Sequence, residues 1–181
     1  MKTLKTTLLV ALLTVLSVSA MAGKPYGRSY SSGGLDEGRR SFVAIGWTFG
    51  VGDLGVSRLS VNSTHGYQLN EHFFVGAGAG LNFYHEYKGS MSEILSLPLY
   101  GDVRADFNIA GDLGFFGDLK VGYAFLDPNG FYLYPNIGLR YGISDNLGVN
   151  FGFGYEMILM VEKGWGSFPM HGLALKLGMD F

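Results

Sequence analysis

The sequence predicts an all-β protein in which eight antiparallel strands close into an up-and-down transmembrane β-barrel. Three observations lead to this fold class. Segments in which large apolar residues alternate with small or polar ones recur along the chain. Apolar residues are abundant, at 48 % of 181, yet they are dispersed among 29 glycines instead of forming a further long apolar run. Charged residues within the alternating segments fall on one face only, so the large apolar face is free to meet lipid.

The N-terminal residues predict export. Lys2 and Lys5 form a positive segment, residues 8–18 form a short apolar run, and Ala20 to Ala22 provide a small-x-small cleavage site, all typical of a secretory signal peptide. The apolar run is about half the length that a spanning helix needs. We therefore expect a signal peptide over residues 1–22, with cleavage after Ala22.

The segment that follows, residues 23–40, is rich in Gly, Ser and charged residues and shows no periodicity. It is predicted to be a flexible N-terminal periplasmic leader. Residues 41–181 are predicted to form the barrel.

The first four strands are predicted over residues 41–51, 59–69, 73–83 and 95–108. The first alternates Val, Ile, Trp and Phe with Ala, Gly and Thr. The second alternates Leu, Val and Tyr with Ser, Asn and Thr, and it stops at the turn cluster 70–72. The third carries glycine at every second position from Gly76 to Gly80. The fourth follows a polar loop, 85–93, and alternates Leu, Val and Phe with Asp and Arg.

The last four strands are predicted over residues 113–125, 131–143, 147–159 and 171–181. Turn-forming residues at 110–112, 127–130 and 144–146 separate the fifth, sixth and seventh strands, and a loop over 161–169 precedes the eighth. An even number of strands brings both ends of the barrel segment to the same side. The last strand is then expected to pair with the first near Val43 to Phe49 and to close the barrel.

The placement of charge is the strongest test of this arrangement. In the second to eighth predicted strands, every acidic or basic residue lies opposite the large apolar face, because a charge at mid-bilayer costs about 2–4 kcal/mol. We expect these residues to form an internal ion-pair network in a lumen that side chains fill. Its predicted members are Asp102, Arg104, Asp106, Asp118, Lys120, Arg140, Glu156, Lys176 and Asp180. A narrow wet path is the alternative, because inward glycines leave space.

Aromatic residues and prolines predict the orientation. Outward aromatic residues gather toward both strand ends around an aliphatic middle, as interfacial girdles do. Pro98, Pro128, Pro135 and Pro169 fall in the outer loops or the outer parts of strands, where strand pairing is expected to loosen because proline has no N–H.

After about Ser41 the chain resembles the small eight-stranded outer-membrane barrels of the OmpA/OmpX type from Gram-negative bacteria. The matching features are the signal peptide, eight alternating strands, tight alternate turns and the terminal run from Gly178 to Phe181. The resemblance implies that the last strand is the signal read by the barrel-assembly machinery, although Gly178 departs from the usual position of the family's glycine. The residues to which it assigns this role are Leu173, Leu175, Leu177, Met179 and Phe181. No periplasmic peptidoglycan-binding domain is expected after Phe181.

The expected function is a structural or surface-interaction role in the bacterial envelope. The alternatives are a narrow pathway for small solutes or lipids, and a lipid-modifying enzyme. Ser63 and His65 resemble the lipid-facing serine and histidine of lipid A deacylases, but His65 is expected near the periplasmic turn, and no acidic residue shares its face nearby. We therefore expect no enzyme activity. His72, His85 and His171 are expected to be solvated or interfacial.

The expected partners are outer-membrane lipid and lipopolysaccharide, together with the assembly machinery during biogenesis. No cofactor and no metal site are expected, and the chain is expected to be a monomer. A net charge of −2 without a basic patch excludes a nucleic-acid partner. The absence of cysteine excludes disulfides, thiolate metal sites and a cysteine nucleophile.

Overall fold

The structure is a computed structural model that describes residues 35, 37–52, 55–84, 94–144, 147–162 and 166–181. The predicted signal peptide, most of the predicted leader and the predicted loop 85–93 lie outside the described residues. No described helix is long and apolar enough to cross a membrane.

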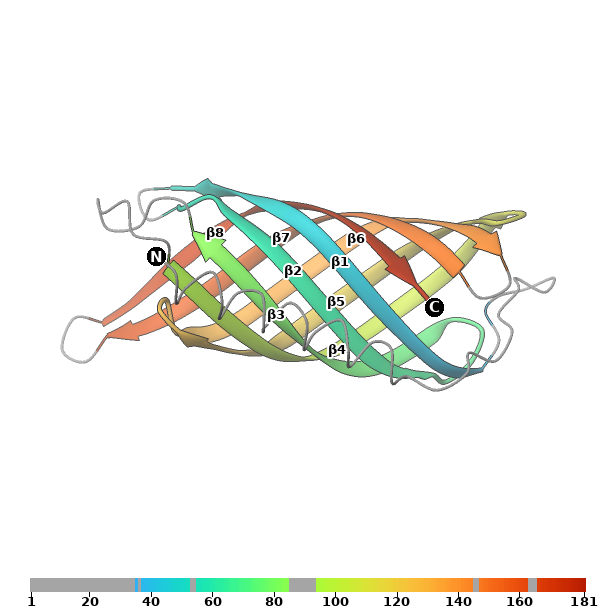
Figure 1. The fold of residues 1–181 in the computed structure, drawn as a ribbon, viewed down its shortest axis with the longest axis horizontal. Helices are drawn as coiled ribbons and strands as arrows, with labels where there is room; N and C mark the ends of the chain where they lie inside the picture. Colours follow the sequence, from blue (N-terminus) through green and yellow to red (C-terminus); the bar gives the residue numbers. More distant parts are fainter. Residues whose placement is uncertain (1–34, 36, 53–54, 85–93, 145–146, 163–165) are drawn as a thin grey trace, which may run out of the picture.

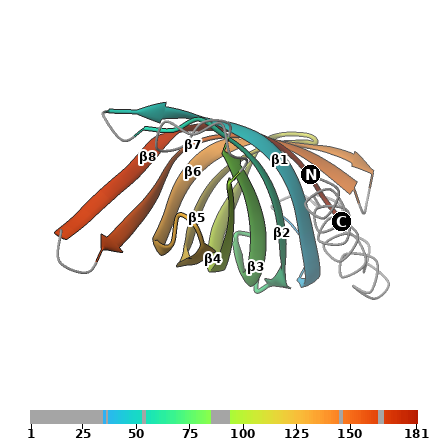
Figure 2. The same cartoon turned by 60° about the vertical axis from the view of Figure 1, so that its left-hand side comes forward.

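Eight antiparallel strands form a closed barrel in which each strand pairs with its neighbours in sequence (Figure 1). Their bounds are β1 Gly38–Val51, β2 Arg58–Gln68, β3 Phe73–Tyr84, β4 Ile94–Ala110, β5 Leu113–Leu126, β6 Gly130–Ser144, β7 Leu147–Glu162 and β8 Gly166–Asp180. The strands are strongly tilted and wrap around the barrel axis (Figure 2). The predicted fold class, an eight-stranded up-and-down barrel, is confirmed.

The seam between β1 and β8 closes the barrel where the sequence predicted. Its register runs from Phe42 opposite Asp180 to Val51 opposite His171. Beyond the ladder, the backbone N–H groups of Ser41 and Phe181 each donate to the other residue's carbonyl, at 2.9 and 3.0 Å. Every described strand thus has a partner on both sides, which removes the free edge strand that an open sheet would expose.

Most strand bounds differ from the prediction by one to three residues, and the largest difference is at the β7–β8 connection. β1 begins at Gly38 rather than Ser41, and β2 begins at Arg58 rather than Leu59. The predicted loop 161–169 is wrong at both ends, because the β7–β8 ladder continues through Leu159 opposite Pro169 to Glu162 opposite Gly166. Residues 163–165 lie outside the described residues. Backbone pairing needs no alternation of side chains, so a ladder can continue where the apolar pattern has ended.

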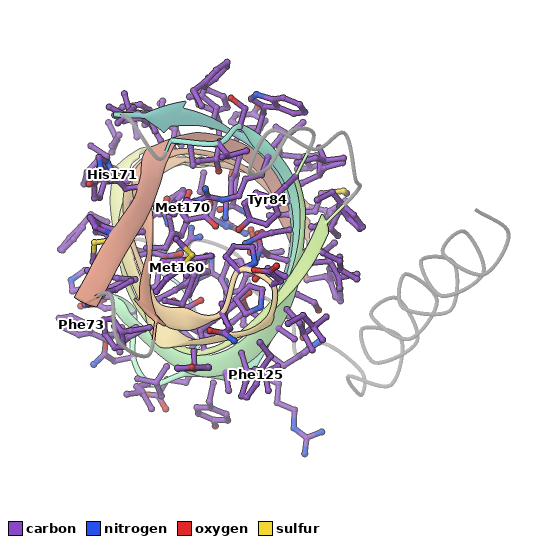
Figure 3. All side chains as sticks on the ribbon, turned by 90° about the vertical axis from the view of Figure 1, so that its left-hand side faces the viewer. Phe73, Tyr84, Phe125, Met160, Met170 and His171 are labelled. Carbon is purple, nitrogen blue, oxygen red and sulfur yellow. The ribbon has the colours of Figure 1, made fainter. Side chains whose placement is uncertain are left out.

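The two faces of the wall have opposite chemistry. Many large apolar side chains on the outer face are exposed, from 37 % for Phe115 to 57 % for Tyr141. Figure 3 looks along the barrel, and in it Phe73 and Phe125 point outward whereas Tyr84, Met160 and Met170 point into the lumen. The buried charged groups therefore lie inside, and the exposed apolar groups lie outside.

Two prolines mark interruptions in the ladder. The β3–β4 pairing passes from Ala79–Leu99 directly to Asn82–Ser96, on either side of Pro98. The β6–β7 pairing likewise passes over Pro135. Both prolines keep their partners on the opposite edge, in the β4–β5 and β5–β6 pairings. The predicted loosening of pairing is confirmed at these two prolines, where it affects one edge of each strand, but it is wrong at Pro169, which keeps its partner Leu159 in the β7–β8 ladder.

Inward glycines make the wall thin enough for large side chains to fill the lumen. A Cβ atom at Gly78 would collide with the Ser63 carbonyl and the Tyr100 ring. At Gly117, in contrast, a Cβ atom would meet no other atom within 4 Å. Glycine is therefore required by packing at the first position and not at the second.

We expect Gly78→Ala to lower the free energy of unfolding by about 1–3 kcal/mol, because the added methyl overpacks a filled interior. The matched substitution Gly117→Ala should change it by no more than about 0.5 kcal/mol. Urea unfolding of the lipid-reconstituted protein, followed by tryptophan fluorescence, measures both. Equal stabilities for the two variants would contradict this view of the lumen.

Candidate functional site

The lumen contains all nine residues of the predicted charge network. Eight of them are buried, with at most 8 % of the residue exposed, and Asp118 is half-buried. They come from β4, β5, β6, β7 and β8. Every second residue of a strand points to the same face, and these residues all lie on the inward face. The structure divides them among three ion-pair clusters along the barrel.

The first cluster, here the terminal-end cluster, lies near the chain's C-terminus and contains Arg40, Arg104, Arg140, Asp106 and Asp180. Arg40 bridges the two carboxylates, with Nη1 2.6 Å from Asp106 and Nε 3.2 Å from Asp180. Arg104 donates from Nε and Nη2 to Asp106 at 2.9 and 2.7 Å. Arg140 Nε lies 3.0 Å from both oxygens of Asp180. Each carboxylate is thus held by two arginines.

Amides and aromatic rings complete this cluster. Asn150 donates to Asp180 at 2.7 Å and accepts from Arg104 at 2.8 Å. The guanidinium carbon of Arg104 lies 3.7 Å from the centre of the Phe116 ring and 4.7 Å from that of Phe42. The cluster has one more arginine than carboxylates, and these ring faces stabilise the excess positive charge.

The second cluster, the central cluster, is a lysine between two aspartates. Lys120 Nζ lies 3.0 Å from Asp102 and is also hydrogen-bonded to Asp118. The strand register explains the contact, because Asp102 stands opposite Lys120 in the β4–β5 ladder and Asp118 precedes Lys120 on the same face. This cluster carries one excess negative charge.

The third cluster, the loop-end cluster, surrounds Glu156. This fully buried carboxylate accepts from Thr48 at 2.8 Å and from Asn82 at 3.3 Å. Two cations pair with it, Arg58 at 3.4 Å and Lys176 at 3.6 Å. Lys176 Nζ lies 3.9 Å from the centre of the Tyr134 ring, and this ring face stabilises the excess positive charge.

The sequence analysis missed Arg40 and Arg58, although the exposed fractions of both are at most 1 %. Arg40 was assigned to the leader because alternation becomes clear only after Ser41. Residue parity is the signal that could have found both, since Arg40 lies two positions before Phe42 and Arg58 two before Ser60, on the inward faces of β1 and β2.

Aromatic side chains fill the lumen beyond the central cluster. Tyr100, Tyr132 and Tyr134 pack with Ile158 in a buried group. Tyr84 and Met170 form a second buried pair nearer the loop end, where Met160 packs against both groups. In Figure 3, Tyr84, Met160 and Met170 lie inside the barrel among other inward-pointing side chains.

A cavity of about 50 Å³ remains between the clusters. Its lining includes Asn62, Asp118 and Tyr134, each of which has a buried polar atom with no protein hydrogen-bond partner among the described residues. A water needs roughly 10–15 Å³ of such volume and two or more polar partners, so the cavity suits a few waters. It is far smaller than a pocket for a drug-sized ligand, which is about 300–1,000 Å³.

No group of three or more acidic or histidine side chains that could hold a metal ion occurs among the described residues. His65 lies on the outer wall between two serines. His72 lies in a turn, with Nδ1 3.2 Å from the Asp106 carbonyl, and His171 packs against Tyr155. His85 lies outside the described residues.

The predicted assembly-signal side chains lie on the outer face of β8 or just after it. Leu173, Leu175, Leu177 and Met179 are exposed, and Phe181 is half-buried. Their inward neighbours include Lys176 and Asp180. The same strand therefore contributes apolar side chains to the outer face and charged side chains to the lumen.

The comparisons with known proteins find similarity in structure but not in sequence. No protein-family model matches the sequence, and no curated protein matches it significantly. Neisserial surface protein A is similar in structure, with a TM-score of 0.57 and 16 % identity, covering 80 % of this chain and 97 % of that one. The N-terminal β-barrel domain of Pseudomonas aeruginosa OprF has a TM-score of 0.50 and 15 % identity, covering 83 % and 100 %. The predicted resemblance to small outer-membrane barrels is confirmed for the fold.

We expect Asp106→Ala to destabilise the barrel by about 3–5 kcal/mol, because it leaves Arg40 and Arg104 buried without their shared carboxylate. The control is Asp112→Ala, which removes an exposed carboxylate from a turn and should change stability by at most about 0.5 kcal/mol. Reversible urea unfolding in lipid vesicles measures the difference. A similar small effect for both variants would show that the cluster adds nothing to stability.

Proposed function

We propose that the chain is a transmembrane barrel of the bacterial outer membrane, exported by its N-terminal signal peptide, with a structural or surface-interaction role in the envelope. The observation that carries the membrane location is the apolar outer wall, to which every strand contributes at least one exposed large apolar side chain. Water-soluble monomers rarely expose apolar patches beyond a few hundred Å². The closed ladder supports the same location, because lipid cannot hydrogen-bond a free strand edge.

The filled lumen supports a closed barrel over the alternative of a pore. Six cations and five anions of the described strands interlock across the interior, and most of their hydrogen bonds join different strands. Barrels of eight strands enclose only enough space for side chains, whereas aqueous channels occur in much larger ones. A continuous path would therefore require breaking ion pairs that the interior cannot replace with bulk water.

The proposed role includes an orientation of the barrel in the membrane and a set of partners. Tight turns and both ends of the barrel segment would face the periplasm, and the longer connections would face outward, next to lipopolysaccharide. The assembly machinery would read the exposed face of β8. The barrel would act as a monomer, since its ladder leaves no described edge for a second copy.

We expect vesicles containing the wild-type protein to retain potassium as well as empty vesicles do. Arg140→Ala and Glu156→Ala each remove one member of a cluster that blocks the lumen, so each should raise the rate of potassium release. A fluorescent potassium indicator outside the vesicles measures the release. Ser60→Ala, which removes a small inward hydroxyl, is the control and should stay tight.

Two results would contradict this proposal. Potassium release through the wild-type barrel would favour the solute pathway. Vesicles that stay tight with both Arg140→Ala and Glu156→Ala would show that the clusters do not act as a plug.

We expect Phe181→Ser to leave most of the exported protein unassembled, because the substitution removes the terminal aromatic side chain while keeping the backbone hydrogen bonds to Ser41. Phe107→Ser, on the outer face of β4, is the matched control and should assemble nearly as well as wild type. The fraction that migrates differently on a gel before and after boiling measures assembly. Equal assembly of the two variants would rule out a special role for Phe181.

A further inference from the structure

A histidine on the outer wall is hydrogen-bonded to two serines. His65 Nε2 lies 3.0 Å from Ser63 Oγ, and His65 Nδ1 lies 2.9 Å from Ser41 Oγ. All three side chains belong to the outward face of adjacent strands β1 and β2. The third group is Ser41, a serine from the neighbouring strand, rather than an acid.

The strand register holds these groups together. Ser41 stands directly opposite His65 in the β1–β2 ladder, and Ser63 lies two residues before His65 on the same face. Both strands are fixed on their other edges, β1 by β8 and β2 by β3. The three side chains are thus placed by a rigid wall and not by a loop.

One tautomer satisfies both contacts. With the proton on Nδ1, His65 donates to Ser41 and its Nε2 accepts from the Ser63 hydroxyl. That is the arrangement in which a histidine activates a serine nucleophile while a third group orients the ring. We propose that Ser63, His65 and Ser41 form a lipid-facing hydrolytic site, with Ser63 as the nucleophile, His65 as the general base and Ser41 as a positioning residue.

Small residues leave room beside the site for a substrate. The row of outward positions that contains His65 continues through Ala77 of β3 to Gly101 of β4. The nearest foreign atom to a Cβ at Gly101 would be 3.9 Å away, so the surface there is open. Ser63 is only 5 % exposed, and its β3 neighbour is the small Ala79. Ala77, Ala79 and Gly101 thus place small side chains beside the site in an otherwise bulky apolar wall.

The depth of the site and its charge indicate the substrate class. The backbone of Ser41 pairs with Phe181, which places the site near the periplasmic interface in the orientation of the proposed function, on which this inference rests. Exposed Arg39 lies two residues before Ser41 on the same face, where its guanidinium suits a lipid phosphate. The substrate is therefore the acyl ester of an anionic glycerophospholipid in the inner leaflet.

The reaction is an ester hydrolysis in two steps. Ser63 Oγ attacks the ester carbonyl carbon as its proton passes to His65 Nε2, and the bond to the glycerol oxygen breaks as that proton passes to the leaving alcohol. Water then attacks the acyl-serine, with His65 taking and returning its proton. One ester and one water give one fatty acid and one lysophospholipid.

The test uses the full-length protein expressed, exported and purified in its folded form, and then reconstituted into phosphatidylglycerol vesicles whose ester-linked chains carry a heavy isotope. Mass spectrometry should detect labelled fatty acid, and release should fall at least ~100-fold in Ser63→Ala and His65→Asn. A fluorophosphonate probe should add one covalent label to the wild type and none to Ser63→Ala. Ether-linked phosphatidylglycerol should give no product.

The role of Ser41 as a positioning residue is tested by a measurement that a purely structural role would leave unchanged. Ser41→Ala should lower kcat while leaving KM unchanged, and Ser41→Thr, which keeps the hydroxyl, should restore kcat. Ser60→Ala, on the opposite face of β2, should retain full activity. The gel mobility shift on boiling reports whether each variant is a folded barrel, independently of hydrolysis.

Each result bears on one of the two proposals. Folded, inserted barrels that release no fatty acid and take no label would overturn the hydrolytic site and leave the barrel role intact. Release that persists in Ser63→Ala, or that occurs from lipopolysaccharide but not from phosphatidylglycerol, would also overturn it. Wild-type protein that does not insert into vesicles would overturn the proposed membrane role itself.

Discussion

The structure depends on one constraint, that hydrocarbon offers no partner for a polar group. The backbone meets it by closing the ladder between β1 and β8, which leaves every described strand paired on both edges. The side chains meet it through the period of two, which sends apolar groups outward and charges inward. Both solutions require the same register, because a slip of one residue would move Lys176 and Asp180 to the lipid face and Leu177 into the lumen.

Once the charges are inside, they must satisfy one another. The three clusters carry excess charges of alternating sign along the barrel, positive around Arg104, negative around Lys120 and positive around Glu156. Amides and aromatic ring faces meet the charges that no carboxylate or cation neutralises. Removing one partner from such a buried pair costs far more than the net contribution of the intact pair, so the network selects one register and one closed lumen. This selection also explains why a small barrel keeps so many charges.

The sequence was sufficient for the architecture and for most of the lumen, and its failures have physical causes. Alternation revealed all eight strands, because one face of each must be apolar. It did not by itself point to Arg40, because parity has to be extended backwards from Phe42 into a stretch where the apolar pattern has not yet begun. It also missed the paired segment around Pro169, where the ladder continues without alternation. The contact of His65 with Ser41 was equally hidden, because the two residues are brought together by a register that no local pattern encodes. The face on which each residue lies could be inferred along a strand, but the distances between residues on different strands could not.

The most direct test of the closed, registered barrel is a disulfide across the seam. The chain has no cysteine, so Ile45→Cys with Leu177→Cys introduces a single pair, directly opposite on the outer face of β1 and β8. Opposite residues in an antiparallel ladder have Cα atoms about 4.5–5.5 Å apart, within the range of a disulfide. The account predicts efficient crosslinking of this pair in membranes by mild oxidant, and none for Ile45→Cys with Lys176→Cys, whose side chains lie on opposite faces. Crosslinking of the shifted pair instead, or of neither pair in folded protein, would contradict it.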